Sequence, residues 1–256
     1  MDAARLVALY RYPVKGFSPE PMQSVDLEAG RFFPGDRLYA VENGPSGFDP
    51  AAPAYVEKTA FLVLMRHARL AALKTRFDPE TTLFTLALDG AEVARGQLST
   101  AEGRAAIEAY LSTYMGKEQR GPLKVLEAPQ GHRFTDSLRS GFVSLLNLAS
   151  VRDLESSMGA ALDPLRFRMN LHLDGLARGA ELELAGKEIT IGPVRLKVLK
   201  RTERCAATNV DPETGVRDVN VVKGLHQAYG HTDCGIYAKV VQGGRIAPGD
   251  AVQIAA

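Results

Sequence analysis

Short apolar runs separated by glycine and proline set the pattern of the first part of the chain. Four runs have strand-like apolar content, at residues 6–10, 38–41, 61–65 and 83–88. Asp89-Gly90 follows the last run and is typical of a tight hairpin turn. Residues 44–53, rich in glycine and proline, predict an exposed loop, either a lid or, more simply, a connector. The first part of the chain is therefore expected to be rich in strands.

A helix is predicted next from the spacing of its apolar residues. Ser99-Thr100-Ala101-Glu102 fits a capping box, in which polar side chains bond the free N–H groups of a first helical turn. Apolar side chains with the spacing of one helical face follow, at Ile107, Tyr110, Leu111, Tyr114 and Met115. Gly116 is expected to end the helix. We expect the tyrosines of this face to belong to the core rather than to surround a cofactor.

The second half combines one further helix with more strands. This helix is expected to begin with Ser150 as its N-cap, to end at Gly159 and to bury Val151, Leu154 and Met158. Strand-like runs follow at residues 188–191, 194–200, 236–242 and 251–254. Many short strands with regular turns favour a closed β-barrel or a sandwich. A βαβ dinucleotide fold is disfavoured because its Gly-rich phosphate fingerprint is absent.

The predicted fold class is mainly β with flanking helices, an α+β arrangement. A length of 256 residues suggests one or two domains, and 45% hydrophobic content is enough to fill a core. We place the boundary near Gly121-Pro122, which gives one domain over residues 1–120 and a second over residues 121–256.

Charge and hydropathy limit the classes of partner. A formal net charge of +1 gives no sign of a general nucleic-acid binder or of binding to an anionic membrane. No basic-then-apolar leader precedes residues 6–9, and the apolar run at 60–65 is far shorter than the ~20 residues that cross a bilayer. We therefore expect a cytoplasmic protein with no nucleic-acid and no membrane partner.

Cys205 is the candidate for chemistry because of its position and its neighbours. The alternating residues 194–200 predict a half-buried strand and Asp211-Pro212 supplies a turn, so Cys205 is expected where a strand leaves its sheet. Arg201 and Arg204 precede it, and cations favour the thiolate, the form that ligates metals and attacks electrophiles. A free cysteine is also commonly just a small core residue.

The second cysteine offers two interpretations. Cys234 stands at an expected strand start and is predicted to fill the core. Together with His226, His231 and Cys205 it offers the residue types of a zinc site, but the short paired spacings of structural zinc are missing. Neither a disulfide scaffold nor an iron–sulfur run is indicated.

Five boxes along the chain carry a resemblance to a known family. In chain order they are Tyr12-Pro13-Val14-Lys15-Gly16, Gly35-Asp36-Arg37, Arg166-Phe167-Arg168-Met169-Asn170, Arg204-Cys205 followed by Thr208 and Val210-Asp211-Pro212-Glu213-Thr214-Gly215, and Gly244-Arg245-Ile246-Ala247-Pro248-Gly249-Asp250-Ala251-Val252. Together they resemble the MOSC family, named for the C-terminal domain of molybdenum cofactor sulfurase. The resemblance implies an N-terminal β-barrel-like domain followed by a MOSC β-barrel.

The resemblance also implies a cofactor, the molybdenum cofactor in its molybdopterin form. Its family pattern assigns Cys205 as the metal ligand and catalytic residue, a soft sulfur donor suited to such a metal. It matches cofactor-binding positions to the basic residues Lys15, Arg37 and Arg168 and to the polar residues Asn170 and Thr208.

The reaction implied by likeness to the mitochondrial amidoxime-reducing component and its bacterial relatives is the reduction of a small N-hydroxylated compound to an amine or amidine. Because this chain has no cysteines for an iron–sulfur domain, a separate iron–sulfur, flavin or haem protein is expected to supply electrons.

Two residues depart from the family pattern. Two alternative functions also stay open. Gly16 stands where a serine is usual, and Met169 where a proline is usual. Cys205 could instead carry a persulfide as a sulfur carrier, or the chain could be a non-catalytic carrier of the cofactor. Pyridoxal phosphate is associated only with the family as a whole. It is the cofactor of the desulfurase found in sulfurase fusions, for which this chain has no room.

Overall fold

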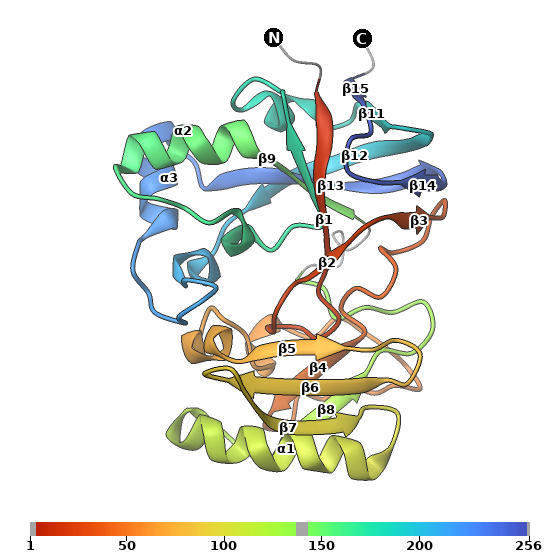
Figure 1. Ribbon diagram of the computed structural model, residues 1–256, viewed down its shortest axis with the longest axis vertical. Helices are drawn as coiled ribbons and strands as arrows, with labels where there is room; N and C mark the ends of the chain where they lie inside the picture. The colour runs from red at the N-terminus through yellow and green to blue at the C-terminus, as the bar shows by residue number, and fades with distance from the viewer. Residues whose placement is uncertain (1–3, 137–142, 255–256) are drawn as a thin grey trace.

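The computed structural model of the protein describes residues 4–136 and 143–254. Within them the chain is mostly β-structure with three α-helices, arranged as two parts that lie one above the other in Figure 1. The predicted fold class, mainly β with flanking helices, is confirmed.

The upper part is built on an eight-stranded sheet that curls into a half-barrel (Figure 1). In order across the sheet, its strands are β15 (Val252–Ile254), β11 (Glu188–Ile191), β12 (Val194–Glu203), β13 (Asp233–Gln242), β9 (Val143–Asn147), β10 (Leu171–Asp174), β1 (Arg5–Arg11) and β2 (Glu20–Met22). Only the neighbours β9 and β10 run parallel among these strands. The curl brings Arg5 beside Ala251, where an isolated bridge joins the start of β1 to the β15 side.

Two helices and a short strand pair complete the upper part. Helices α2 (Leu148–Met158) and α3 (Val221–Tyr229) contact each other beside the sheet. Strands β3 (Val25–Leu27) and β14 (Gly244–Ile246) pair antiparallel.

The lower part holds two smaller sheets and one helix (Figure 1). Strands β5 (Lys74–Phe77), β6 (Leu83–Leu88) and β7 (Ala91–Gln97) form an antiparallel sheet, and β4 (Tyr39–Asn43) pairs with β8 (Leu123–Glu127). Helix α1 (Ala101–Met115) packs on β7 and β8 and buries Ile107, Leu111 and Met115 in their shared core.

The two parts of the structure do not correspond to two consecutive halves of the sequence. Strand β1 lies between β10 and β2, and its Leu6 and Leu9 belong to the core of the upper sheet. The chain then descends at residues 12–15, builds the lower part over residues 39–127, and returns to the upper part at β9. The division into 1–120 and 121–256 stays a prediction about sequence segments, because residues before 120 contribute to both parts.

Several predicted elements are confirmed. The runs at 83–88 and 188–191 are β6 and β11 with the same bounds. Asp89 and Gly90 have φ values of 52° and 82° in the turn between β6 and β7, as a tight hairpin requires. Helix α1 is confirmed with its end at Gly116, but its N-cap is Thr100 rather than the Ser99 of the predicted capping box: the Thr100 hydroxyl accepts a 3.0 Å hydrogen bond from the Gly103 N–H.

Two predictions need correction. Helix α2 begins three residues earlier than expected, with Asn147 as its N-cap, because the Ser150 hydroxyl is used elsewhere, as a donor to Glu181. Residues 61–65 were expected to form a strand, but they form none. Only Phe61 makes an isolated bridge, to Glu42, and the backbone turns at Val63, whose carbonyl accepts from Arg66 and His67.

Helix α3 was not predicted from the sequence. It is short, and Asn220 provides its N-cap by accepting a 3.0 Å hydrogen bond from the Lys223 N–H. Across residues 4–136 and 143–254, none of the helices has the length and apolar character needed to cross a membrane.

The contact between α1 and β7 yields a first prediction. A Cβ atom at Gly103 would clash with the Gln97 carbonyl oxygen, so the glycine lets the helix approach the strand closely. Alanine is ordinarily favoured over glycine in a helix by ~1 kcal/mol, but overpacking typically costs ~1–3 kcal/mol. We expect Gly103→Ala to lower the free energy of unfolding by about 1–2 kcal/mol in urea denaturation. Ala106→Ser, at an exposed position of α1, should change it by less than ~0.5 kcal/mol; equal stability of G103A and wild type would contradict the close contact.

A buried carboxyl group gives a second prediction, on pH. Glu181 is 1% exposed, and its Oε2 accepts hydrogen bonds from Asn147 Nδ2 (2.8 Å) and Ser150 Oγ (2.9 Å). Burial raises its pKa above the ordinary 4.5, although these donors partly oppose the rise. Folding therefore favours the protonated form, so this group's contribution to stability is complete below pH 4.5 and declines as pH rises through the folded pKa.

The variant Glu181→Gln tests this directly. Its stability should decline less than that of wild type as pH rises from 4.5, because glutamine does not titrate, whereas Glu183→Gln should keep the wild-type profile. Urea denaturation at a series of pH values measures the difference. Parallel profiles for wild type and E181Q would show that the burial of Glu181 does not control this pH dependence.

Candidate functional site

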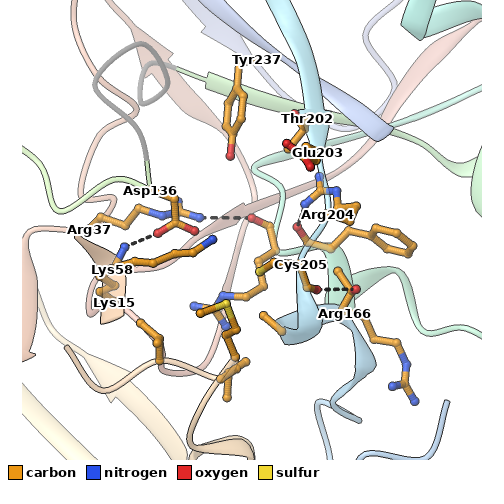
Figure 2. A pocket seen from close by; sticks show the side chains of 18 of the residues that line it. Lys15, Arg37, Lys58, Asp136, Arg166, Thr202, Glu203, Arg204, Cys205 and Tyr237 are labelled. Atoms are coloured by element: carbon orange, nitrogen blue, oxygen red, sulfur yellow. Dashed lines mark hydrogen bonds and ion pairs between the residues drawn. The ribbon is translucent and has the colours of Figure 1, made fainter. Parts of the chain in front are cut away.

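A cavity of about 240 Å³ lies where the upper and lower parts meet. The lower part and the segments that descend to it contribute the loop after β1, Arg37, the short helix η1 (Lys58–Ala60) and residues 63–65. The upper part contributes the helical turn η4 (Pro164–Phe167), the end of β12 and Tyr237 of β13. Figure 2 shows these side chains converging on one space.

Five of the six predicted site residues line this cavity. They are Lys15, Arg37, Arg168, Cys205 and Thr208, which come from four separate segments of the chain. The fold therefore brings together residues that lie as far apart in sequence as Lys15 and Thr208.

Asn170 is the predicted residue that the fold keeps away from the cavity. It is 2% exposed, and its side-chain oxygen accepts from the Ser144 hydroxyl at 2.7 Å and from the Ser144 N–H at 3.2 Å. Its amide nitrogen donates to the Tyr10 carbonyl at 3.1 Å. Both ends of the amide join strands and Asn170 does not line the cavity, so its contact with a cofactor stays a prediction.

Cys205 lies where β12 leaves the sheet, as the alternation at 194–200 predicted. It precedes the helical turn η6 (Ala206–Asn209), and its carbonyl accepts hydrogen bonds from the Thr208 N–H (3.0 Å) and the Thr208 hydroxyl (2.9 Å). Thr208 thus fixes the turn that presents the thiol. The Cys205 side chain is partly exposed and lines the cavity.

The cation beside the thiol is Lys58 rather than Arg201 or Arg204. Arg201 pairs with Glu183 at 2.7 Å, outside the cavity. Arg204 donates to the carbonyls of Cys234 (2.8 Å) and Phe167 (2.9 Å).

Lys58 instead directs its ammonium group into the cavity (Figure 2). Burial alone would lower the Lys58 pKa, but the Asp136 carboxylate and a hydrogen bond with the Cys205 sulfur raise it above its ordinary value. The ammonium is therefore charged at neutral pH and lies beside the Cys205 sulfur.

Arg37 and Arg168 hold a tyrosine between them. Their guanidinium carbons lie 5.0 Å and 4.5 Å from the centre of the buried Tyr12 ring, and Arg37 Nη2 donates to the Arg168 carbonyl at 3.2 Å. Both arginines have positive φ values, 49° and 53°, which is rare outside glycine and helps to aim both side chains at one cavity.

The two guanidinium groups differ in their partners. Arg37 is paired with the adjacent Asp36 carboxylate. Among residues 4–136 and 143–254, Arg168 has no acceptor for its guanidinium, and burial lowers its pKa to about 10. Arg168 is still charged at neutral pH, so it presents unused donors to the cavity.

Lys15 and Asp136 form an ion pair at the wall of the cavity, in which Lys15 is buried and Asp136 is partly exposed. The Lys15 ammonium is 4% exposed, contacts the Asp136 carboxylate and donates to the Phe134 carbonyl at 3.1 Å. Burial lowers the Lys15 pKa, and the Asp136 carboxylate offsets part of that change.

Sequence reasoning missed several residues of the cavity, including Lys58, Asp136, Thr202 and Tyr237. Thr202 is 3% exposed, and its hydroxyl has no hydrogen-bond partner in the described parts of the chain. Burial raises the Tyr237 pKa, which keeps the phenol neutral at neutral pH. Along β13, Tyr237 lies on the face of the strand opposite to that of the core residues Ile236 and Ala238. The alternation of the sequence could therefore have predicted that Tyr237 points away from the core. Lys58 and Asp136 carry no comparable pattern.

Asp36 and Asp211, two acidic residues of the family boxes, have structural roles. Asp36 accepts from the Tyr12 N–H at 2.7 Å and pairs with Arg37. Asp211 accepts from the N–H groups of Glu213 and Thr214 and pairs with the buried Arg166 at 3.0 Å.

The zinc interpretation finds no support in the geometry. Cys234 is buried in the core of the upper part beside α2 and α3, where burial raises its pKa to about 12, as expected of a core residue. In the described ranges, 4–136 and 143–254, no three His, Cys, Asp or Glu side chains are grouped to hold a metal ion.

Comparison with solved structures gives distant likenesses. The YUAD protein from Bacillus subtilis aligns over 99% of this chain and 96% of its own length, with 14% identity and a TM-score of 0.46. YiiM from Geobacillus stearothermophilus aligns over 52% of this chain and 67% of its own length, with 18% identity and a TM-score of 0.37.

Sequence comparison is more specific. Mouse (Mus musculus) mitochondrial amidoxime-reducing component 1 is 36% identical over 74 residues, which are 29% of this chain and only 21% of that protein. The MOSC N-terminal beta barrel domain matches residues 3–119, and the MOSC domain matches residues 134–253. These two matches cover nearly the whole chain in the family's order, and the chain therefore belongs to the MOSC family.

Proposed function

We propose that this protein binds a molybdenum–pterin cofactor in the cavity and reduces small N-hydroxylated compounds. The observation that carries the proposal is Arg168: its charged guanidinium, stacked on Tyr12, has no acceptor in the described residues and faces the same cavity as the Cys205 sulfur. An anion-binding arginine and a soft metal ligand in one cavity fit a cofactor that carries both a phosphate and a metal.

Further features of the cavity support the fit. The Thr202 hydroxyl is buried without a partner, and such a group is stabilised when a ligand completes its hydrogen bond. A side chain at Gly16 would clash with the Leu62 carbonyl, so the serine usual in the family does not fit this backbone. Thr202 offers a hydroxyl in the same cavity in its place.

Each residue has a distinct task in this proposal. Arg168 and Lys58 bind the phosphate and neutralise its charge, and the Tyr12 ring holds Arg168 in place. Cys205 offers its thiolate to the metal. Lys15 and Asp136 hold each other, so Lys15 stays at the wall of the cavity without moving into the site. Tyr237 keeps its proton and can donate a hydrogen bond to a substrate oxygen.

The reaction needs two electrons and two protons to convert an N–OH group into N–H and water. The bound cofactor would supply the two-electron chemistry, and the protein supplies binding, orientation and exclusion of water. We propose that a separate iron–sulfur, flavin or haem protein delivers the electrons.

The proposed anion contact predicts the effect of changing Arg168. Arg168→Gln should weaken cofactor retention about tenfold or more, because a charge-assisted hydrogen bond contributes ~1.5–3 kcal/mol. The measurement is molybdenum per chain, with acid-released pterin fluorescence, in protein from a host that makes the cofactor. Arg178→Gln, an exposed arginine paired with Asp153, is the matched control and should retain the wild-type metal content. Equal molybdenum in R168Q and wild type would count against Arg168 as the phosphate contact.

The proposed metal ligand predicts a contrast between the two cysteines. Cys205→Ser should abolish reduction of an amidoxime, because serine lacks the soft sulfur donor. Cys234→Ala should keep both the metal and the activity, since Cys234 lies in the core. A metal-loaded C205S that reduces amidoximes would refute the ligand assignment. Wild-type protein that gains one sulfur on Cys205 from a desulfurase, and never holds molybdenum, would instead indicate a persulfide carrier.

A further inference from the structure

A second cavity, of about 270 Å³, lies on the lower part and is lined by aromatic side chains. Residues 53–56 and 131–135 form two of its walls, and Phe32 and Phe61 complete it. The rings of Phe61 and Phe134 meet edge-to-face with centroids 5.4 Å apart. Because aromatic rings pack favourably on one another, this lining suits a planar aromatic guest.

The aromatic cavity adjoins the Cys205 cavity. The chain passes from Val56, in the aromatic cavity, to Lys58, in the Cys205 cavity, within two residues. It does so again from Thr135 to Asp136. The Tyr55 hydroxyl links these two segments by donating a hydrogen bond to the Asp136 carbonyl at 3.2 Å. The two cavities therefore share a wall made of the same two segments.

The polar groups of the aromatic cavity favour a neutral ring over a cation. The Arg133 guanidinium lies 5.5 Å from the centre of the Phe32 ring, so a positive charge already occupies one edge. Burial lowers the His132 pKa, which leaves that imidazole neutral at neutral pH. An apolar cavity of ~150 Å³ accepts benzene, so about 270 Å³ is room for one substituted ring.

We propose that this aromatic cavity is the subsite that binds the planar ring of an aryl N-hydroxylated substrate while its N–OH group reaches the Cys205 cavity. The inference rests on the proposed function, since that function defines the reacting group. It adds a preference: aryl amidoximes are better substrates than alkyl amidoximes because their rings are buried against Phe32, Tyr55 and Phe134.

Filling the cavity from its exposed side tests this preference. Ala54 is exposed and lines the cavity, so Ala54→Phe places a ring in the proposed subsite without disturbing buried residues. Ala52→Phe, at an exposed position that does not line this cavity, is the matched control. Steady-state kinetics with benzamidoxime and with acetamidoxime are compared for both variants and wild type.

We expect A54F to lower kcat/KM for benzamidoxime by at least about tenfold, mainly through KM, and to leave acetamidoxime within about twofold. A52F should leave both substrates within about twofold. Equal effects of A54F on the two substrates, or none on benzamidoxime, would overturn the subsite.

A binding measurement separates failure of the subsite from failure of the proposed function. Binding of benzamide, a neutral planar ring, followed by saturation-transfer NMR, requires no turnover. Wild-type protein that reduces neither amidoxime but binds benzamide, with loss of binding in A54F and retention in A52F, would reject the reductase and keep the ring site. If wild type does not bind benzamide, or A54F binds it as well as A52F does, the ring site is rejected whatever the activity.

Discussion

The hydrogen bonds of Asn170 are the contacts on which the candidate site depends. Through Ser144 on β9 and Tyr10 on β1, this one buried side chain joins two strands on either side of its own. The Tyr10 N–H also donates to the Asn170 carbonyl at 2.8 Å. The junction fixes the end of β1, so the chain that continues to Tyr12 and Lys15 faces the chain that ends at Arg168. A polar residue in the interior is tolerated because every one of these groups is paired.

The backbone conformation of Arg37 and Arg168 directs their charged side chains toward the cavity. Arg37 and Arg168 both adopt positive φ, which ordinarily costs free energy, and each is held by contacts with the other segment. Their shared partner, Tyr12, is buried in between, and burial raises its pKa well above the ordinary value, so the ring remains neutral. A neutral ring between two cations lowers their repulsion through its π face. The cavity can thus collect several positive groups without an equal number of carboxylates.

The sequence predicted local features better than long-range ones. Strand alternation, hairpin chemistry and the glycine after α1 depend on neighbouring residues, and they agree with the structure. The location of Cys205 at a strand end followed from the alternation of residues 194–200 and the turn at Asp211-Pro212. Lys58 and Asp136 could not be predicted in this way, because their roles arise from contacts with Cys205 and Lys15 far along the chain. For Asn170 the family pattern was not enough. Its match to a family position gave no sign that both ends of its amide join strands.

The pairing of β1 with β10 also has a consequence for the order in which the molecule can be made. One edge of β1 can pair early with β2, but on its other edge Arg5 pairs with Asp174, which is synthesised about 170 residues later. At ~5–20 residues per second, that delay is roughly ten to thirty seconds, during which this second edge of β1 has no partner. The lower part can fold in the meantime, because β4 to β8 are synthesised before β10 and the β5–β6–β7 sheet is built from neighbouring strands. Because the cavity is lined by residues from Lys15 to Tyr237, it is complete only after Tyr237 has been synthesised, and any cofactor must enter after that point.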